Sequence, residues 1–487
     1  MPPPLPSPTP ARVSPTRELL VIAAPTVLTM VSYPLKQFID AWMVGRLGPE
    51  FLAGQGNGAV AAFLPISFFL GLFTVVNTWV AQHLGAGRPE RGAAYAWNTL
   101  WLCLFGWLMM AAAAGLVAPL FGALRHDAVI ENAEITYGRL LLLGSFFPIA
   151  ARGLSHYFYG VHRPTPVMVA TIVGNIVNLA LDWLLIFGHL GFPELGIAGA
   201  AYATIIGGMV EFSIEFAVFL SPAYHRAFGT RSNRRLSLDR VREIWRLGWP
   251  GAVAWVNELT CWAVFMTILV GFFGPEHNAA GWIAMRYMQL SFMPAVGMSI
   301  AVTAVVGRCV GAGDRAAAAV RAWAGVRLAM IYMGVFAVLF IVFREPMVRF
   351  FAHGAYTPEE QARVVAIGVR LMILAAVFQL FDAIAIVMAG ALRGAGDTVW
   401  PGLVGAVLSW VFIVGAGWLL MTLTPGLESL GPWLGAAGYI IAMGIAMPLR
   451  FLIGPWRRIT LVRPASGEKP ATPAEPSGDP QWPARAD

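Results

Sequence analysis

The stretch Leu247–Glu258, LGWPGAVAWVNE, is the point at which the sequence begins a second time. A basic segment ends just before it, and a long apolar segment opens there with Trp249 and Pro250. An earlier apolar segment opens in the same way around Ala24 and Pro25. The second half of the chain therefore repeats the first.

Four pairs of short motifs support one duplication, at shifts of about 225 to 234 positions. The pairs are LGPE at 47–50 with FGPE at 273–276, Gly71 with Gly297, GAG at 85–87 with GAG at 311–313, and FYGVHRPTP at 158–166 with LRGAGDTVWP at 392–401.

The composition places the chain in a membrane. Hydrophobic residues make up 58% of the 487 positions and charged residues only 12%, and the mean hydropathy is +0.67. A typical soluble domain is about 25% charged. The sequence is therefore that of an integral membrane protein, and its net charge of +7 lies in loops rather than in a nucleic-acid-binding stripe.

Both ends of the chain have the composition of disordered extensions, predicted over 1–17 and 457–487. The first seventeen residues hold seven prolines, and the tail is rich in Pro, Ala and Ser. No short apolar stretch with a cleavage site precedes the first span, so the first helix itself is expected to target the chain. The three cysteines lack metal-ligand spacing and imply no disulfide framework.

A bilayer-spanning helix needs about 20 mostly apolar residues, and twelve segments meet this requirement. Six lie before a basic linker at 222–243 and form an N-lobe over 18–221, and six lie after it and form a C-lobe over 244–456. The approximate spans are Leu19–Val44, Gly58–Ala81, Ala94–Phe121, Tyr137–Tyr159, Val167–Phe187, Ile197–Leu220, Ile244–Phe272, Ala280–Val306, Ala319–Phe343, Val364–Leu392, Pro401–Met421 and Leu434–Ile453.

Arginines gather in every second loop, which the positive-inside rule assigns to the cytosol together with both termini. They are Arg88, Arg91, Arg163, Arg226, Arg231, Arg234, Arg235, Arg240, Arg242, Arg308, Arg315, Arg457 and Arg458. Six helices return the chain to its starting side, so the second six insert the same way up. The predicted fold is all-α, with two parallel six-helix bundles related by a pseudo-two-fold axis and with sites near mid-membrane if the protein is a transporter.

Ionisable side chains inside spans cost about 2.5–3.5 kcal/mol each on insertion scales and so indicate function. The polar groups are Tyr33, Lys36, Gln37 and Asp40 on one face of the first span, Thr171, Asn175, Asn178 and Asp182 on one face of the fifth, Thr204, Glu211 and Glu215 in the sixth, Asn257 and Glu258 in the seventh, and Gln379 and Asp382 in the tenth. The alternative is that they only join helices by hydrogen bonds, or, for Glu211 and Glu215, that they reach the interface.

Residues 16–458 resemble the multidrug and toxic compound extrusion (MATE) transporters, most closely the bacterial NorM-type branch. The resemblance rests on Pro25 and Asp40, the GAG turn at 85–87, NIVNLALD at 175–182, Pro250 with Glu258, and QLFDAIAIVMAGALRGAGD at 379–397. It implies export of organic cations or other drugs across a bacterial inner membrane, in exchange for protons or sodium ions, by two lobes that open alternately inward and outward.

The resemblance also implies residue roles. Glu258 and Asp382 match a C-lobe acidic pair associated with cation coupling. An N-lobe cation-binding cluster, a candidate sodium site, is matched by Asp40, Asn178, Asp182 and Thr204. Pro25 matches the proline at which the first helix bends, and Pro250 is its counterpart. Sodium-binding members carry a tyrosine where this chain has Phe378, which favours protons in the C-lobe.

The residues themselves support the same chemistry. Oxygen-bearing side chains from three helices suit a sodium ion, and carboxylates in a poorly hydrated lobe can hold a proton instead. Lys36 departs from the family pattern, because its ammonium reaches Asp40 at (i, i+4) and occupies that carboxylate; the alternative is that it pairs with another acid or extends to the interface. Residues expected to modulate these sites are Lys36, Gln37, Asn175, Gln379 and Phe378. The mid-span aromatic residues Trp255, Trp262 and Phe378 are candidate drug contacts.

Two other classes of function stay open. A lipid-linked-sugar or polysaccharide flippase of the same superfamily would have a more strongly cationic cavity, and an integral-membrane enzyme would need a cluster of His, Cys or acids that isolated His156 and His162 do not provide. The GAG turns lack the strand and lysine of a phosphate loop and indicate helix ends. We expect a monomer that binds cationic or amphipathic small molecules and lipid, with no nucleic acid and no resident cofactor.

Overall fold

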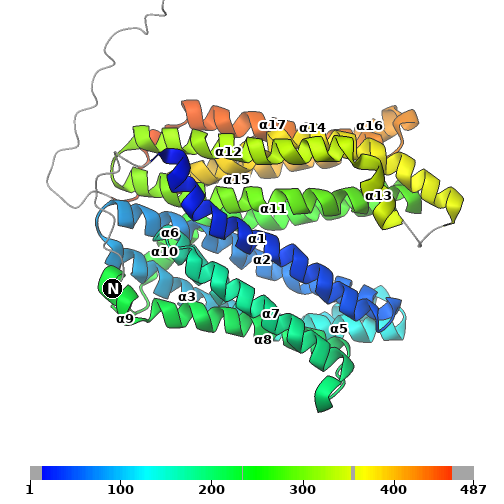
Figure 1. The fold of residues 1–487 in the computed structure, drawn as a ribbon, viewed down its shortest axis with the longest axis horizontal. Coiled ribbons are helices and arrows are strands. Elements are labelled where there is room, and N and C mark those ends of the chain that lie inside the picture. The colour runs from blue at the N-terminus through cyan, green and yellow to red at the C-terminus, as the bar shows by residue number, and fades with distance from the viewer. Residues whose placement is uncertain (1–13, 233, 353–356, 463–487) are drawn as a thin grey trace, which may run out of the picture.

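The computed structural model describes residues 14–232, 234–352 and 357–462, and these residues are almost entirely helical (Figure 1). The first half contains α1 (Pro15–Gly45), α2 (Pro49–Gly85), α3 (Pro89–Ala113), α4 (Val117–Leu124), α5 (Ala128–Leu143), α6 (Phe146–Gly160), α7 (Thr165–Phe187), α8 (Ile197–Phe219) and α9 (Pro222–Phe228). The second half contains α10 (Leu238–Val264), α11 (Pro275–Gly311), α12 (Arg315–Val342), α13 (Arg344–Ala352), α14 (Pro358–Ala395), α15 (Val399–Leu408), α16 (Gly417–Leu423) and α17 (Leu430–Ile453). Two π-helical segments, η3 (Phe265–Val270) and η5 (Ser409–Ala416), extend α10 and α15. The predicted all-α class is confirmed.

Eleven helical stretches of the described residues are long and apolar enough to cross a membrane. The predicted fourth span, Tyr137–Tyr159, is not one helix, because it falls across α5 and α6 with a break at Gly144 and Ser145. Pro148 has no N–H for the carbonyl group of Gly144, which is the bond that a continuous helix needs there. α5 and α6 follow one another from one end of the bundle to the other (Figure 1), so the pair supplies the twelfth crossing.

The basic linker predicted over 222–243 is partly helical. It contains α9, and α10 begins at Leu238 rather than at the predicted Ile244. Asp239 in the first turn favours this earlier start, because an acidic side chain stabilises a helix N-terminus. Of the extensions predicted at the two ends, residues 1–13 and 463–487 lie outside the described residues, and α1 begins at Pro15.

The first helix of each lobe, α1 or α10, packs with its first turns against the opposite lobe. Leu19 and Ile22, at the start of α1, are buried in a core cluster with α11 and α12 of the C-lobe. Ile244 and Leu247, near the start of α10, are buried in a core cluster with α2, α3 and α6 of the N-lobe. The two lobes are therefore joined through α1 and α10 as well as through their facing surfaces.

Two glycines bring the backbones of the lobes into contact where α2 meets α11. A Cβ atom on Gly85 would lie 2.0 Å from the carbonyl oxygen of Arg308. A Cβ atom on Gly311 would likewise lie 2.0 Å from the carbonyl oxygen of Gln82. Both pairs are related by the shift that relates the two GAG turns. The contact therefore repeats about the pseudo-two-fold axis, and the GAG turns are part of the interface between the lobes.

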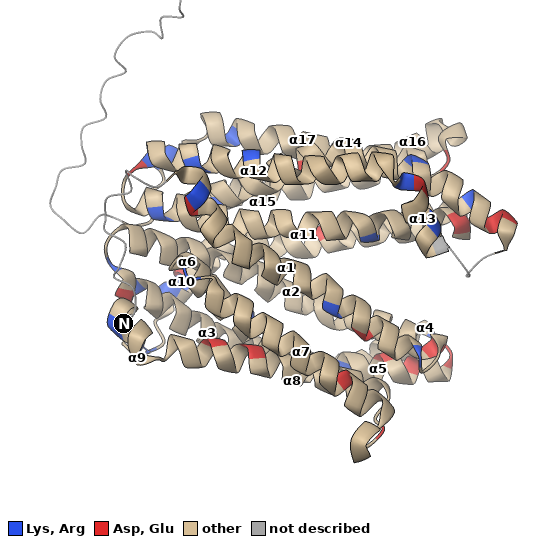
Figure 2. Ribbon diagram, viewed as in Figure 1, with Lys and Arg blue, Asp and Glu red and all other residues tan. Residues whose placement is uncertain are grey.

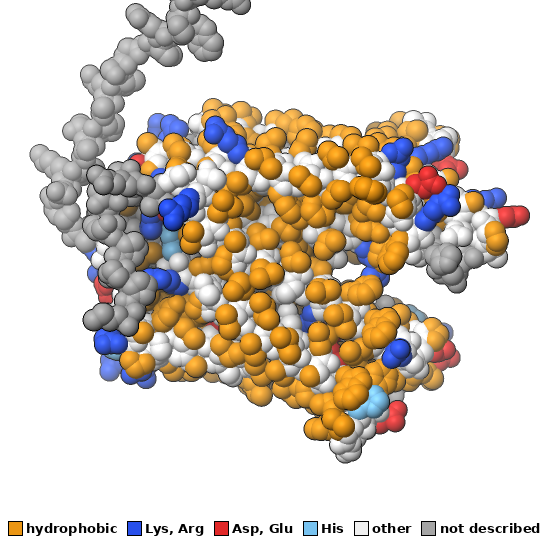
Figure 3. All heavy atoms as spheres, in the orientation of Figure 1, with side chains coloured by type: hydrophobic (Ala, Val, Ile, Leu, Met, Phe, Trp, Pro, Cys, Tyr) orange, Lys and Arg blue, Asp and Glu red, His pale blue; other side chains and the backbone are white. Residues whose placement is uncertain are grey.

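The lobes meet at the end of the bundle that carries α9 and the GAG turns. Lys and Arg side chains are frequent at this end (Figure 2), which includes Arg163, Arg234 and Arg308 and is called the basic end below. At the opposite end the lobes separate, and a cleft opens between them on the face shown in Figure 3. The structure is thus closed at the basic end and open at the other.

Replacement of Gly85 by alanine is expected to push the lobes apart at the basic end. The new methyl group would lie inside the contact radius of the Arg308 carbonyl oxygen, and overpacking of this kind costs about 1–3 kcal/mol. Spin labels at Arg91→Cys and Arg315→Cys, measured by double electron–electron resonance, should report a longer distance. Gly56→Ala is the control on the same helix, since nothing lies within 4 Å of its Cβ position; equal lengthening there would contradict the role of the glycine contact.

Candidate functional site

The N-lobe holds an acidic cluster between α1, α7 and α8. Lys36 Nζ lies 3.2 Å from Asp40 Oδ2, so the predicted ion pair on α1 is formed. Asp40 is 6% exposed, and its other carboxylate oxygen has no hydrogen-bond partner among the described residues. That oxygen is available to a proton or a second cation.

Asp182 and Asn178, both on α7, belong to the same cluster. Both side chains are fully buried, and none of their polar atoms has a hydrogen-bond partner in the part of the chain that the structure describes. Asp182 lies close enough to Asp40 for the two charges to repel. Because an unpaired buried polar group costs about 1–3 kcal/mol, these orphaned oxygens indicate a site that a ligand completes.

Thr204 of α8 and Tyr137 of α5 form the wall of this cluster. Tyr137 contacts Thr204 and Gln55, and it interacts electrostatically with both Asp40 and Asp182. The sequence pattern predicts Thr204 but misses Tyr137 and Gln55. Neither residue belongs to a polar stripe on its own helix, so the sequence does not indicate it. Only the packing between helices places both residues beside the Asp40 cluster.

Two members of the predicted polar stripes differ from the buried acids of the cluster. Gln37 is three residues from Asp40 and so shares its face of α1, but it is exposed. The modulating role predicted for Gln37 stays a prediction. Asn175 donates to Ser32 Oγ at 3.1 Å and so joins α7 to α1 one turn before Asn178.

The C-lobe contains a pocket of about 170 Å³ between α10, α14, α15 and α17, with α2 of the N-lobe on one side. Glu258 and Trp255 line this pocket and have exposed side chains. Asp382 of α14 is half-buried and lies close enough for its charge to repel that of Glu258. Tyr439 of α17 lines the pocket and interacts with both carboxylates. The structure therefore brings the predicted acidic pair together beside two aromatic rings.

Three further candidates of the C-lobe have structural partners. Asn257 donates to Ser409 Oγ at 2.9 Å, and Gln379 is 2% exposed and donates to Ser291 Oγ. Phe378 is 1% exposed and packs in the C-lobe core. Phe378 therefore does not line the pocket, and the drug contact predicted for it is not formed in this arrangement.

An ion-paired cluster closes the basic end, and the sequence pattern did not predict it. Glu18, at the start of α1, accepts hydrogen bonds from Arg308 at 2.7 Å and from Arg321 at 2.8 Å. Arg308 also reaches Nδ1 of His162 at 3.4 Å, in the turn between α6 and α7. Nε2 of His162 lies 3.1 Å from the carbonyl oxygen of Ala304. These contacts tie α1 and an N-lobe turn to α11 and α12 of the C-lobe.

Pro25 and Pro250 lie where α1 and α10 pass from one lobe to the other. α1 packs on the C-lobe before Pro25 and contributes Met30 to the N-lobe core after it. α10 contributes Leu247 to the N-lobe core before Pro250 and Cys261 to the C-lobe core after it. Because each proline removes one helical hydrogen bond, both helices lack a backbone hydrogen bond at the point where a change in the angle between the lobes would bend them. α1 lacks a second one at Pro34.

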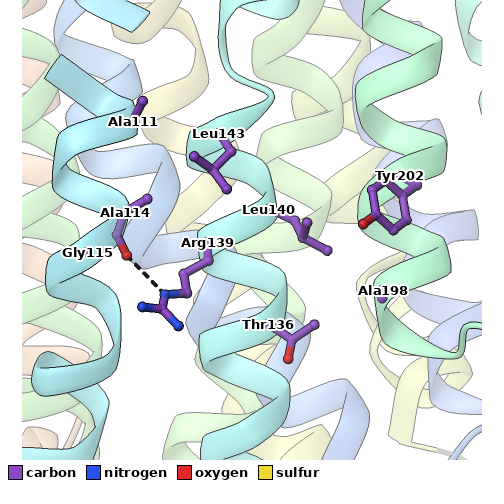
Figure 4. A pocket seen from close by; sticks show the side chains of 9 residues that line it. All are labelled: Ala111, Ala114, Gly115, Thr136, Arg139, Leu140, Leu143, Ala198 and Tyr202. Atoms are coloured by element: carbon purple, nitrogen blue, oxygen red, sulfur yellow. Dashed lines mark hydrogen bonds between the residues drawn. The ribbon is translucent and has the colours of Figure 1, made fainter. Parts of the chain in front are cut away.

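A separate hollow lies on the side of the N-lobe, between α3, α5 and α8 (Figure 4). Its lining is mostly apolar, with Leu140 and Tyr202 among its residues. Arg139 donates from Nε to the carbonyl oxygen of Ala114 at 3.2 Å. The hollow shares no lining residue with either acidic cluster, so we assign it no part in their chemistry.

The MatE family model matches residues 25–184 and 256–418, one block in each lobe. The chain belongs to the MatE family. The acidic residues of both clusters lie inside the matched blocks. A probable multidrug resistance protein NorM from Pseudomonas putida is 31% identical over 446 residues, which cover 90% of this MatE chain and 95% of the relative.

Solved transporters share the fold of this MatE protein. A MOP superfamily transporter from Pyrococcus furiosus superposes with a TM-score of 0.82 at 21% identity, over 92% of this chain and 98% of the other. A multidrug resistance MATE family transporter in an outward-facing conformation gives 0.80 at 21% identity, over the same shares of the two chains. The protein is thus a multi-pass membrane protein with the two-lobed architecture of a transporter family, and none of these proteins is named as an enzyme.

His162 is expected to make the closed basic end sensitive to acid. Burial, and then the nearby Arg308, lower the pKa of His162 from 6.5 to about 3, so its ring is neutral in the closed arrangement. A lowered pKa means that closure is fully favoured above about pH 6.5 and weakens as the pH falls towards 3. The distance between spin labels at Arg91→Cys and Arg315→Cys should therefore lengthen over that range.

His162→Asn is the matched variant, because it keeps a donor for the Ala304 carbonyl and an acceptor for Arg308 but takes up no proton. Its label distance should stay constant between about pH 7 and pH 5. Equal lengthening in the wild type and in His162→Asn would show that another group, such as Glu18, controls the response.

Proposed function

We propose that the chain is a secondary antiporter that exports organic cations or amphipathic drugs in exchange for protons, acting as a monomer by alternating access. The observation that carries the proposal is the C-lobe pocket, where Glu258 and Asp382 bring two carboxylates beside Trp255 and Tyr439. The name of the Pseudomonas putida relative, a multidrug resistance protein, supports the same class of function.

The charges around the pocket favour a cationic substrate. Glu258, Asp382 and Asp397 supply three acids, against the two bases Arg393 and Arg450. Arg450 is bonded to Asp397 at 2.8 Å, which leaves Glu258 exposed to a ligand. An organic cation gains from both a carboxylate and an aromatic face. A flippase for a lipid diphosphate would need the opposite excess, so this pocket favours drug export over that alternative.

Exchange follows when drug and proton compete for one carboxylate. A ligand shifts the equilibrium between two lobe arrangements only by its differential affinity for them. Glu258 lies eight residues after Pro250 on α10, the helix that joins the lobes in the C-lobe repeat. A change of charge at Glu258 therefore acts on the element that must bend when the lobes move.

The N-lobe cluster also bears on the choice of coupling ion. The orphaned oxygens of Asp40, Asn178 and Asp182, with Thr204, would suit sodium, which takes oxygen ligands. However, the ammonium of Lys36 already occupies one oxygen of Asp40 and repels a second cation. We therefore favour protons as the coupling ion, with sodium as the alternative for this site and no resident cofactor.

The basic end is proposed to face the cytosol of a bacterium, with both termini on the same side of the inner membrane. Arginine-rich short loops remain cytoplasmic during insertion. This end carries α9, the turn that holds Arg163 and the last helical turn of α11, which holds Arg308. Reaction of a cysteine at Arg234 with an impermeant reagent outside intact cells would refute this orientation.

Glu258→Gln and Asp382→Asn are each expected to reduce drug efflux at least about tenfold while the protein still inserts at normal levels. Each change removes a negative charge for which drug and proton compete. Fluorescent-cation efflux from cells, normalised to membrane protein, measures the loss. Glu276→Gln is the control, because Glu276 lies in the same lobe outside the pocket and pairs with Arg363. Normal export by either pocket variant would make these carboxylates structural.

Lys36→Ala is expected to shift the pH dependence of efflux to higher pH by about one unit, or to make efflux sodium-sensitive. The ammonium no longer competes for the Asp40 carboxylate, so a proton or sodium binds there more readily. Efflux from proteoliposomes under separate pH and sodium gradients provides the measurement. Lys36→Arg keeps the charge and should resemble the wild type. Unchanged profiles in Lys36→Ala, with transport intact, would remove Lys36 from the mechanism.

A further inference from the structure

A second group of buried ionisable side chains lies in the N-lobe, nearer the basic end than the Asp40 cluster. Glu211 and Glu215 come from α8, Arg152 from α6 and Tyr33 from α1. Tyr33 precedes Asp40 by two turns of α1, about 10 Å along the helix. The group is therefore distinct from the cluster already described, and the proposed mechanism does not use it.

Glu211 is held in place from several helices. Tyr33 donates to Glu211 Oε1 at 2.9 Å, and Thr171 of α7 donates to the same oxygen at 2.6 Å. Arg152 lies over the Tyr33 ring, 4.5 Å from its centroid, and attracts both glutamates. The side chain of Glu211 is 9% exposed, so it does not reach the membrane interface as the alternative interpretation supposed.

Glu215 lies one turn further along α8 and is fully buried. Ser155 donates to its Oε1 at 2.8 Å, but Oε2 has no hydrogen-bond partner among the residues that the structure describes. The hydroxyl group of Tyr159 is buried without a partner in the same ranges, and it interacts electrostatically with Glu215 and Glu211. The site therefore has an acceptor that lacks a donor.

The charges of this site do not balance when every group takes its usual form. Glu211 and Glu215 supply two negative charges, and Arg152 supplies one positive charge. The other titratable or polar groups around them include Tyr33 and Thr29 from α1, Ser155, His156 and Tyr159 from α6, and Thr171 from α7. Arg393 of α14 acts on His156, whereas Arg152 is the arginine that acts on Glu215. An uncompensated buried charge costs several kcal/mol, and a proton on one carboxyl group removes it. Arg152 repels a metal ion from the same place.

We propose that Glu211 and Glu215 share an exchangeable proton and form a second proton-coupling site of the N-lobe. This proposal deepens the proton-coupled antiport proposed above and rests on it. Polar side chains lie between this site and the Asp40 cluster. Asn175 of α7 donates to Ser32 Oγ of α1, and Asn178 lies one turn further along α7, towards Asp182.

The repeat gives independent support. Tyr33 lies eight residues after Pro25, as Glu258 lies eight residues after Pro250. The equivalent positions of α1 and α10 are therefore both linked to a carboxyl group. In the C-lobe the residue at this position, Glu258, carries the carboxyl group itself, and in the N-lobe the hydroxyl of Tyr33 donates to the carboxyl group of Glu211.

Infrared difference spectroscopy of the full chain in lipid vesicles tests for the shared proton. Raising the pH should remove protonated-carboxyl bands in the wild type, those of Glu258 and Asp382 included, and one of these bands should be missing in both Glu211→Gln and Glu215→Gln. Glu134→Gln is the matched control, since Glu134 is equally buried in the N-lobe but is bonded to His126 and Asn57; it should keep every band of the wild type. Identical band changes in the wild type and in both glutamine variants of the site would overturn the proposal.

Transport of ethidium, a fluorescent organic cation, into proteoliposomes gives the second measurement. The number of protons exchanged per ethidium should fall by one in Glu215→Gln and be restored in Glu215→Asp, which keeps a carboxyl group. An unchanged ratio in Glu215→Gln would reject the site. If the wild type moves no ethidium under a pH gradient, the antiport itself is rejected, while the infrared change still decides whether the two glutamates share a proton.

Discussion

The backbone contact between α2 and α11 is the constraint on which the arrangement of the lobes depends. Glycine at 85 and at 311 lets each helix approach a carbonyl oxygen of the other, which any larger residue would prevent. Gln82, in the same turn of α2, donates to the carbonyl oxygen of Gly394 in the C-lobe at 2.9 Å. With the basic end held in contact, an inclination between the lobes appears as an opening at the other end, which is where the cleft lies (Figure 3).

α1 and α10 connect the inclination of the lobes to the charged sites, because each helix packs on both lobes. Along α1, Glu18 is bonded to the C-lobe, Pro25 follows, and Tyr33 and Asp40 face the interior of the N-lobe. A helix fixed to both lobes must bend when they separate, and a missing hydrogen bond at proline makes that bend easiest there. Asp40 and Glu18 lie on the same helix, α1. A proton or cation bound near Asp40 therefore changes the charge on the helix that the Glu18 cluster fixes to the C-lobe.

Local sequence pattern predicted the elements well and their partners poorly. Apolar length is enough for twelve crossings, and spacing by three or four residues is enough to place Asp40 with Lys36. The break at Pro148 is visible in the sequence but looks like any proline within a span, so it was missed. The spacing also places Gln37 on the face of Asp40 but does not record that it is exposed. Phe378 was predicted to contact drugs from its mid-span position, and such a position does not record that neighbouring helices bury the ring. The Glu18 cluster depends on α1 packing against the opposite lobe, which no local pattern records.

The two lobes place different chemistry at one repeated position, and this difference separates their tasks. In the C-lobe the position is Glu258, a carboxylate exposed on a pocket of about 170 Å³, which is where drug and proton compete in the proposed antiport. In the N-lobe it is Tyr33, a phenol whose hydroxyl donates to Glu211 on α8. In the C-lobe the acid therefore lies on the helix that joins the lobes, α10. In the N-lobe it lies on α8, a neighbour of the joining helix α1. In the proposed antiport, a change in the charge of the N-lobe site therefore reaches α1 through one hydrogen bond, from Tyr33 to Glu211.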